Sequence, residues 1–241
     1  AYRRQRQMCI RDSTWILEGC RTPFIDYCGA FGTLSPTDMG IKVAREALAR
    51  SGVAATAIES VIAGSMAQAD FDAYMLPRHI GLYAGVPIAT PSTLAQRICG
   101  TGFELFRQAA DQIALGYART ALVVGTESMT RNPIAAYTHR SGFRLGAPVE
   151  FKDFLWEALD DPAARVSMIQ TAENLARDYG ISREAADAYA VRSHQRAAAA
   201  WEAGRFADEI VPVKVPQRKG DPVLFTRDEG FRADATTDSM G

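Results

Sequence analysis

Short apolar runs alternate with helical patterns from residue 14 to residue 125, and this alternation limits the fold more than any other feature of the sequence. Strands that alternate with helices of about 10 to 15 residues indicate βαβ units and a sheet covered on both faces. The sequence therefore predicts an α/β fold. The runs interpreted as strands are 15–17, 58–66, 94–98 and 121–124, the last ended by Gly125.

Helices are predicted between these runs. The first has Thr37 as its N-cap and Gly52 as the residue after its last turn. Pro77 can open the second helix at its first turn, and Gly116 ends the third. Apolar residues recur at helical spacing in the first and third helices: Ile41, Ala44, Ala47 and Leu48, and then Leu105, Ala109 and Ile113.

The pattern changes after residue 125. Residues 126–166 are polar and rich in glycine, proline and aromatic residues, and they contain only a short amphipathic piece around 151–159. Two helices and an extended segment are predicted beyond them: 168–179, followed by Gly180; 182–203, with Ser182 as N-cap; and 209–215.

These patterns divide the chain into three parts. Residues 1–13 are predicted to be a disordered or non-native extension, because the stretch carries four arginines and no helical or strand period. Those arginines could also dock a phosphate. Residues 14–126 are predicted to form a β/α lobe whose sheet is covered by helices. Residues 127–241 are predicted to form a helical, loop-rich insertion.

Charge and composition exclude several classes of partner. The net charge is −1, which gives no sign of a nucleic-acid partner or an anionic membrane. No apolar run approaches the roughly 20 residues that a membrane-spanning helix requires. Four cysteines without CxxC spacing and only three histidines leave few ligands for a zinc site, so no metal is expected. A reducing, cytoplasmic location is the prediction.

Cys99 is the candidate nucleophile. It is followed by Gly100 and Gly102, at a point where a strand would turn into a helix. Unpaired N–H groups and the dipole at a helix N-terminus favour a thiolate, which is the nucleophile that acyl transfer needs. The Cys99 N–H could help to hold a developing oxyanion. The alternative is an inert thiol in the core, since free cysteine is among the most buried residue types.

The residues themselves assign no base to this nucleophile. A cysteine nucleophile normally needs a base, usually histidine, within hydrogen-bond reach. The candidates are His79 on a predicted helix, His139 in a loop and His194 inside a helix. Each pattern is more typical of a histidine in contact with the core, with solvent or with an anion.

Short motifs, each weak alone, occur in a fixed order along the chain. They are 21–24 (RTPF), 96–102 (QRICGTG), 125–130 (GTESMT), 171–176 (TAENLA), 182–183 (SR), 193–195 (SHQ), 204–213 (GRFADEIVPV), 218–221 (RKGD) and 228–232 (DEGFR). In this order and at these distances the chain from about Arg21 to its end resembles the thiolases. These enzymes transfer acyl groups between coenzyme A (CoA) thioesters and 3-ketoacyl-CoA.

The resemblance implies roles that periodicity does not show. The fold would be a thiolase-like N-terminal β/α lobe, with 127–241 as a CoA-binding loop domain. Cys99 would carry the acyl group as a thioester. Leu159 and Met168 would line the channel for the pantetheine arm, and Arg218 would approach the nucleotide phosphates. CoA would be a substrate, with no metal or redox cofactor, and the full-length protein would be a homodimer or homotetramer.

The chain departs from the thiolase pattern in two ways. Residues 167–170 (SMIQ) lack the histidine that contacts CoA in many acetyl-CoA thiolases, so the acyl specificity is open. The chain also stops at 236–241, where a second, similar half should begin. That half would supply the activating histidine, an asparagine motif and a second cysteine, so this chain alone is expected to be inactive or nearly so.

Two other functions compete with a thiolase. A ketoacyl-synthase-type condensing enzyme also places a cysteine at a strand-to-helix turn, but the CoA loop region and the motif at 204–213 argue against it. A non-catalytic, thiolase-like protein could bind acyl-CoA or lipid without chemistry. The presence of Cys99 argues for chemistry, because a pure binder need not keep a thiol there.

Overall fold

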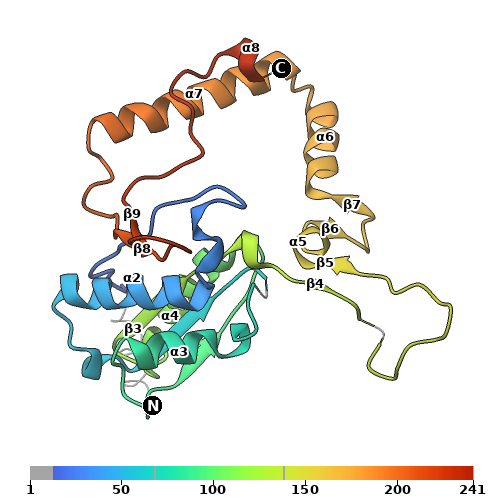
Figure 1. The fold of residues 1–241 in the computed structure, drawn as a ribbon. Helices are drawn as coiled ribbons and strands as arrows, with labels where there is room; N and C mark the ends of the chain where they lie inside the picture. Colours follow the sequence, from blue (N-terminus) through green and yellow to red (C-terminus); the bar gives the residue numbers. More distant parts are fainter. Residues whose placement is uncertain (1–12, 68, 138, 241) are drawn as a thin grey trace, which may run out of the picture.

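The computed structural model describes residues 13–67, 69–137 and 139–240. The predicted extension therefore falls outside the described residues, apart from its last position. Figure 1 shows a layered α/β lobe and a helical arm that stands away from it. The predicted α/β fold is confirmed.

A parallel sheet forms the centre of the lobe. β1 (Ser60–Gly64) lies between β2 (Ser92–Leu94) and β3 (Ala121–Gly125). β1 is buried along its whole length, as expected for a middle strand with both faces covered. In this part of the described chain β2 and β3 are edge strands, and β3 buries only alternate residues.

Helices cover both faces of this sheet. α2 (Pro36–Ser51) and α3 (Leu76–Tyr83) pack against one face, and α4 (Thr101–Ala114) packs against the other. Successive side chains of a strand point to opposite faces. Val61 therefore belongs to the core under α2 and α3, whereas Ile62 belongs to the core under α4. The predicted sheet with helices on both faces is confirmed.

The N-cap of α2 is Ser35, not the predicted Thr37. The Ser35 hydroxyl accepts the N–H of Asp38 at 3.0 Å, and the Asp38 carboxylate accepts the N–H of Ser35 at 3.2 Å. This capping box satisfies two N-terminal donors, and Pro36 occupies the first turn. Thr37 consequently lies inside the first turn. Gly52 ends the helix in the left-handed conformation, as predicted, with φ of 66°.

Two strand predictions are wrong. Residues 15–17 form no strand; their side chains are exposed, and a cavity of about 500 Å³ lies between this segment and β3. A strand needs a neighbour to pair its backbone groups, and residues 15–17 are not paired with β3 or with any other described strand. The predicted strand 94–98 is also wrong beyond Leu94, where β2 ends; at the other end of this range Ile98 has a left-handed φ of 47°, outside the range of a strand.

The helical arm follows the sequence closely. α6 (Met168–Tyr179) ends at Gly180 with φ of 63°, and α7 (Arg183–Glu202) begins with Ser182 as its N-cap, as predicted. The remaining elements are short: η1 (Ala30–Thr33), η2 (Ala55–Ala57), η3 (Ala73–Met75), η4 (Met129–Arg131), β4 (Ile134–Ala135), β5 (Lys152–Asp153), α5 (Phe154–Glu157), β6 (Asp160–Asp161), β7 (Val166–Ser167), β8 (Val213–Val215), β9 (Val223–Phe225) and α8 (Thr237–Met240).

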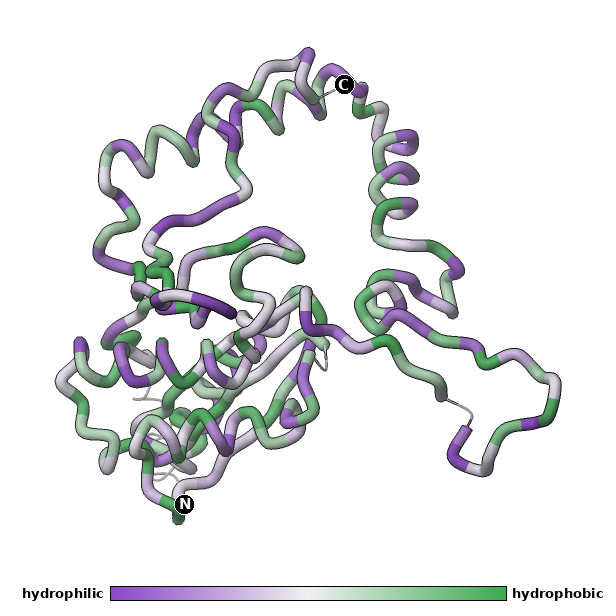
Figure 2. Tube along the Cα trace, in the orientation of Figure 1, coloured by the Kyte–Doolittle hydropathy of each residue, from purple (hydrophilic) through white to green (hydrophobic). Residues whose placement is uncertain are grey.

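The arm contributes little to the core, but the chain after it returns to the lobe. α6 buries none of its residues and α7 buries only Ala198, although both helices carry hydrophobic as well as hydrophilic residues (Figure 2). In the β8–β9 hairpin, by contrast, Val213 and Val215 pack with Phe31 and Leu34 of the lobe. The predicted domain boundary at 126/127 stays a prediction.

Arg21 joins the start of the lobe to the two segments of chain that return to it after the arm, around Glu209 and Asp228. Its guanidinium forms a bidentate pair with Asp228, at 2.7 and 2.9 Å, and its Nε donates to Glu209 at 2.8 Å. Backbone bonds join the same segments, because the Arg21 N–H donates to the Glu209 carbonyl and the Val211 N–H donates to the Arg21 carbonyl, each at 2.8 Å. Three motifs that are far apart in sequence therefore meet at one side chain.

The Arg21–Asp228 pair should make stability depend on pH in acid. Burial by itself raises the pKa of Asp228, but hydrogen bonds from Arg21 and from the Phe24 N–H outweigh it and hold the pKa below its usual value. A carboxyl whose pKa is lowered by folding stabilises the protein above about pH 4, and this contribution is lost as the pH falls through the folded-state pKa.

We therefore expect Asp228→Asn to lower the free energy of unfolding at pH 7. Below pH 4 the free energy of unfolding should decrease less steeply with falling pH in this variant than in wild type. Urea unfolding between pH 7 and pH 2 measures both effects. Asp221→Asn, on an exposed loop, is the control and should leave the acid slope unchanged. An equal slope in wild type and Asp228→Asn would contradict the assignment.

Candidate active site

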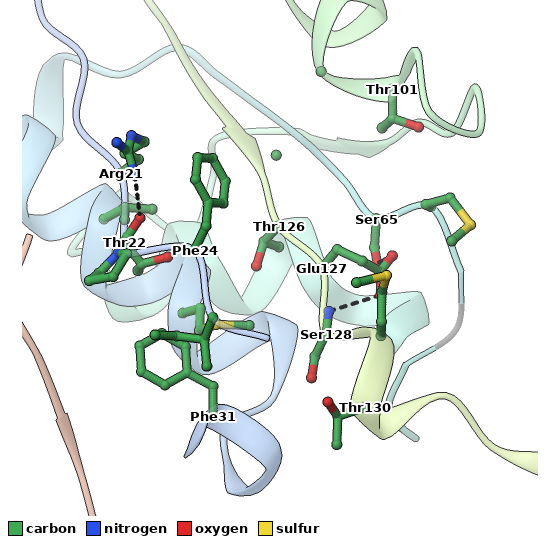
Figure 3. Close-up of a pocket in the computed structure, with 18 of the residues that line it drawn as sticks. Arg21, Thr22, Phe24, Phe31, Ser65, Thr101, Thr126, Glu127, Ser128 and Thr130 are labelled. Atoms are coloured by element: carbon green, nitrogen blue, oxygen red, sulfur yellow. Dashed lines mark hydrogen bonds between the residues drawn. The ribbon is translucent and has the colours of Figure 1, made fainter. Parts of the chain in front are cut away.

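A cavity of about 490 Å³ lies at the carboxyl ends of β1 and β3. Ligands of open α/β sheets commonly bind at this edge, outside the carboxyl ends of the strands. Figure 3 shows Phe24 and Phe31 on one side of the cavity and Ser65 and Glu127 on the other. Cys99 is one of the lining residues. The candidate nucleophile therefore faces a space large enough to admit part of a substrate.

Cys99 occupies a tight turn between β2 and α4. Ile98 has a left-handed φ of 47°, and Gly100 is the N-cap of α4, so Cys99 lies directly before the N-cap of the helix. Its thiol is free and exposed. This exposure excludes an inert thiol in the core, and it leaves Cys99 able to meet a substrate.

Gly64 lets this turn pack closely on the end of β1. A β-carbon at Gly64 would lie 2.2 Å from the carbonyl oxygen of Ala95 and 2.7 Å from the Thr101 methyl group. Both distances are far shorter than van der Waals contact. The position of the Cys99 turn therefore depends on the missing side chain at the end of the central strand.

Glu127 holds the ends of β1 and β3 together beside the cavity. One carboxylate oxygen accepts the Ser65 hydroxyl at 2.7 Å and the Ala67 N–H at 3.0 Å. The other oxygen accepts the Ser128 N–H at 2.9 Å (Figure 3). Sequence reasoning assigned no role to Glu127. The signal was its place directly after a buried apolar strand, where a carboxylate can bind the N–H groups of neighbouring loops.

The three candidate histidines lie elsewhere. His79 Nδ1 is 3.5 Å from the Asp72 carboxylate, His139 stacks on Phe143 with ring centroids 4.6 Å apart, and His194 Nδ1 accepts the Arg232 N–H. None of the three is among the described residues that line the Cys99 cavity. The cavity's other thiol, Cys20, donates to the Val43 carbonyl, and burial raises its pKa.

The structure brings together only two of the residues expected to contact CoA. The Met168 N–H donates to the Leu159 carbonyl at 2.9 Å, and both residues lie at the start of the arm. Arg218 is exposed in the β8–β9 hairpin, which Figure 1 places on the other side of the molecule. None of the three lines the Cys99 cavity, so their roles stay predictions.

Residues 13–67, 69–137 and 139–240 contain no group of three or more His, Cys, Asp or Glu side chains placed to hold a metal ion. No helix within them is both long enough and apolar enough to cross a membrane.

Comparison with known families matches residues 14–241 to the model "Thiolase, N-terminal domain". Among curated proteins, the mitochondrial 3-ketoacyl-CoA thiolase of Homo sapiens is 36% identical over 233 residues, covering 97% of this chain and 58% of that protein. The beta-ketothiolase BktB of Cupriavidus necator is 40% identical over 225 residues, covering 93% of this chain and 57% of that protein.

A solved structure gives the same result in three dimensions. The human mitochondrial 3-ketoacyl-CoA thiolase in complex with CoA superposes with a TM-score of 0.86 at 36% identity, covering 94% of this chain and 56% of that one. The chain thus spans less than three-fifths of the length of the relatives that it matches.

Proposed function

Since this chain belongs to the thiolase family, we propose that it supplies the nucleophile of an acyl-CoA C-acyltransferase. The observation that carries the proposal is the position of Cys99. Its free thiol is exposed and lines a cavity at the carboxyl ends of two parallel strands, and Cys99 lies directly before the N-cap of α4. The names of the relatives favour thiolase chemistry over that of a ketoacyl synthase.

The proposed reaction has two acyl-transfer steps. The Cys99 thiolate attacks the thioester carbonyl of an acyl-CoA, and the Cys99 N–H helps to hold the oxyanion that forms. The C–S bond to CoA breaks, CoA leaves as its thiolate, and the acyl group stays on Cys99. The enolate of acetyl-CoA then attacks the acyl group and frees the Cys99 thiolate, which is condensation. In the reverse direction, thiolysis, Cys99 attacks the 3-keto carbonyl of a 3-ketoacyl-CoA, the bond between C2 and C3 breaks, and acetyl-CoA leaves as its enolate and takes a proton. The thiolate of a CoA then takes the acyl group from Cys99 and frees the Cys99 thiolate.

We propose Leu159, Met168 and Arg218 as the groups that hold CoA. Leu159 and Met168 are adjacent and partly exposed, which suits apolar contact with a pantetheine arm. The exposed guanidinium of Arg218 suits a phosphate. The solved relative that binds CoA supports CoA as the substrate.

The unpaired sheet edge and the free cysteines bear on the assembly and location of the protein. We propose a homodimer or homotetramer; β2 has an unpaired edge within the described chain, and Leu94 on it is exposed. We also propose a cytoplasmic location, because Cys20, Cys28 and Cys99 are free. The 3-ketoacyl-CoA thiolase of Homo sapiens is named as mitochondrial.

Alkylation tests the nucleophile. Cys28 is exposed like Cys99 but does not line the cavity, so it serves as an internal control. At pH 7 we expect iodoacetamide to label Cys99 about tenfold faster than Cys28, because Cys99 lies beside the N–H groups at the start of α4. Acetyl-CoA should slow labelling of Cys99 alone. Peptide mass spectrometry measures both rates, and equal labelling of the two cysteines with no protection would favour a non-catalytic binder.

A further inference from the structure

The turn that carries Cys99 contains an unusual backbone conformation. Ile98 has φ of 47°, in the left-handed region that β-branched residues rarely adopt because the side chain crowds the backbone. The residue is exposed, with an exposed fraction of 40%, so hydrogen bonds rather than core packing have to hold this conformation. A strained residue of this kind persists only where its surroundings hold it.

One hydroxyl group holds both sides of Ile98. The Thr101 Oγ1 accepts the N–H of Arg97, the residue before Ile98, at 2.8 Å. The same hydroxyl donates to the carbonyl of Ile98 at 2.6 Å. The N–Cα bond of Ile98, about which φ rotates, lies in the chain between the Arg97 N–H and the Ile98 carbonyl. Since both groups are hydrogen-bonded to one oxygen atom, this rotation is restricted.

The position of Thr101 is itself fixed. Its exposed fraction is 6%, and its methyl group faces Gly64 at the end of β1. Its own N–H donates to the Ile98 carbonyl at 3.1 Å, and the Gly100 N–H donates to the Arg97 carbonyl at 3.0 Å. The Thr101 hydroxyl is therefore engaged as donor and acceptor inside the turn, and it is not free to bind a substrate.

We propose that Thr101 is a positioning residue, whose hydroxyl keeps Ile98 left-handed so that the thiol and N–H of Cys99 face the cavity. This proposal rests on the proposed role of Cys99 as nucleophile. Without the hydroxyl, the Arg97 N–H loses its partner and Ile98 relaxes towards negative φ. Cys99 then moves away from the N-terminus of α4, and the helix no longer activates its thiol.

The test measures alkylation of Cys99 by iodoacetamide, relative to Cys28, between pH 6 and pH 9 in the intact protein. Thr101→Val keeps the shape of the side chain and removes the hydroxyl; we expect Cys99 to react about tenfold more slowly, a change that corresponds to one lost hydrogen bond. Thr101→Ser keeps the hydroxyl and should react within about twofold of wild type. In turnover, Thr101→Val should lower kcat and leave KM nearly unchanged.

A second substitution separates positioning from general damage. Glycine adopts the left-handed conformation without strain, so Ile98→Gly removes the need for the hydroxyl. In the Ile98→Gly background, Thr101→Val should slow Cys99 by less than about threefold. If Thr101→Val slowed alkylation of Cys99 as much in the Ile98→Gly background as in wild type, the proposal would be overturned. Alkylation of Cys99 at the full wild-type rate in the Thr101→Val single variant would overturn it too.

The outcomes also distinguish this proposal from the proposed function. If wild-type Cys99 reacts no faster than Cys28, the nucleophile assignment fails and the positioning role fails with it. If Cys99 is fast in wild type and equally fast in Thr101→Val, only the positioning role fails. Should Thr101→Val not fold, Ile98→Gly alone decides: relief of strain predicts an unchanged or raised melting temperature, whereas Leu94→Gly, at a similarly exposed residue of β2, should lower it.

Discussion

Replacing Cys99 by alanine in the intact protein is expected to abolish acyl transfer, with kcat falling by at least about 10⁴-fold. In the proposed reaction the thiol forms the covalent intermediate, so tighter binding of the substrate by other groups cannot restore the activity. Among the described residues of the cavity the only other thiol is Cys20, whose pKa is raised by burial and which donates to the Val43 carbonyl.

The measurement is the CoA-dependent cleavage of acetoacetyl-CoA, followed by loss of the 3-ketoacyl-CoA absorbance. Mass spectrometry of the protein mixed with acetyl-CoA adds a direct readout, because an acetyl adduct should form on wild type and not on Cys99→Ala. Cys28→Ala, outside the cavity, is the matched control and should keep wild-type turnover. Turnover by Cys99→Ala above a tenth of the wild-type rate would contradict the nucleophile assignment.

Gly64→Ala should cause the largest loss of stability from a single added methyl group. The new β-carbon would lie 2.2 Å from the Ala95 carbonyl oxygen, 2.7 Å from the Thr101 methyl group and 3.2 Å from a Leu105 methyl group. The nearest atom is backbone, so it cannot move aside by rotating a side chain. We expect a loss of about 3 kcal/mol in the free energy of unfolding, the upper range for overpacking a core.

Gly102→Ala is the matched control for Gly64→Ala. A β-carbon at Gly102 would meet nothing within 4 Å, and the residue lies in the first turn of α4. Alanine is favoured over glycine in a helix by up to about 1 kcal/mol, so this variant should be neutral or more stable. Urea unfolding of both variants makes the comparison, and equal stabilities would show that the turn can move away from β1 at little cost.

Much of the fold could be predicted because its signals are local. The buried run at Val61 and Ile62 and the apolar spacing of Leu105 and Ala109 reflect the periods of a strand and a helix. Gly180 ends α6 and Ser182 caps the start of α7, and each contacts only the adjacent turn of its helix. Each of these predictions needs only the residues next to it in sequence, and the structure confirms them.

Predictions that depended on distant partners were less successful. Residues 15–17 have the composition of a strand, yet a cavity lies between them and β3, and no period can reveal that separation. The role of Glu127 was missed for the same reason, because its partners Ser65 and Ala67 are about sixty positions away in the chain. The capping box of Ser35 and Asp38 was local and should have been recognised.

By itself the sequence determined the α/β class, most helix boundaries, the family and the candidate nucleophile Cys99, because periods, caps and ordered motifs are carried by neighbouring residues. Only the tertiary structure decided how that thiol is presented. The left-handed Ile98, the hydroxyl of Thr101 that holds it and the space left by Gly64 form one contact between β1 and the Cys99 turn. Gly64 is more than thirty positions from that turn, and side chains at such a distance meet only after the chain has folded.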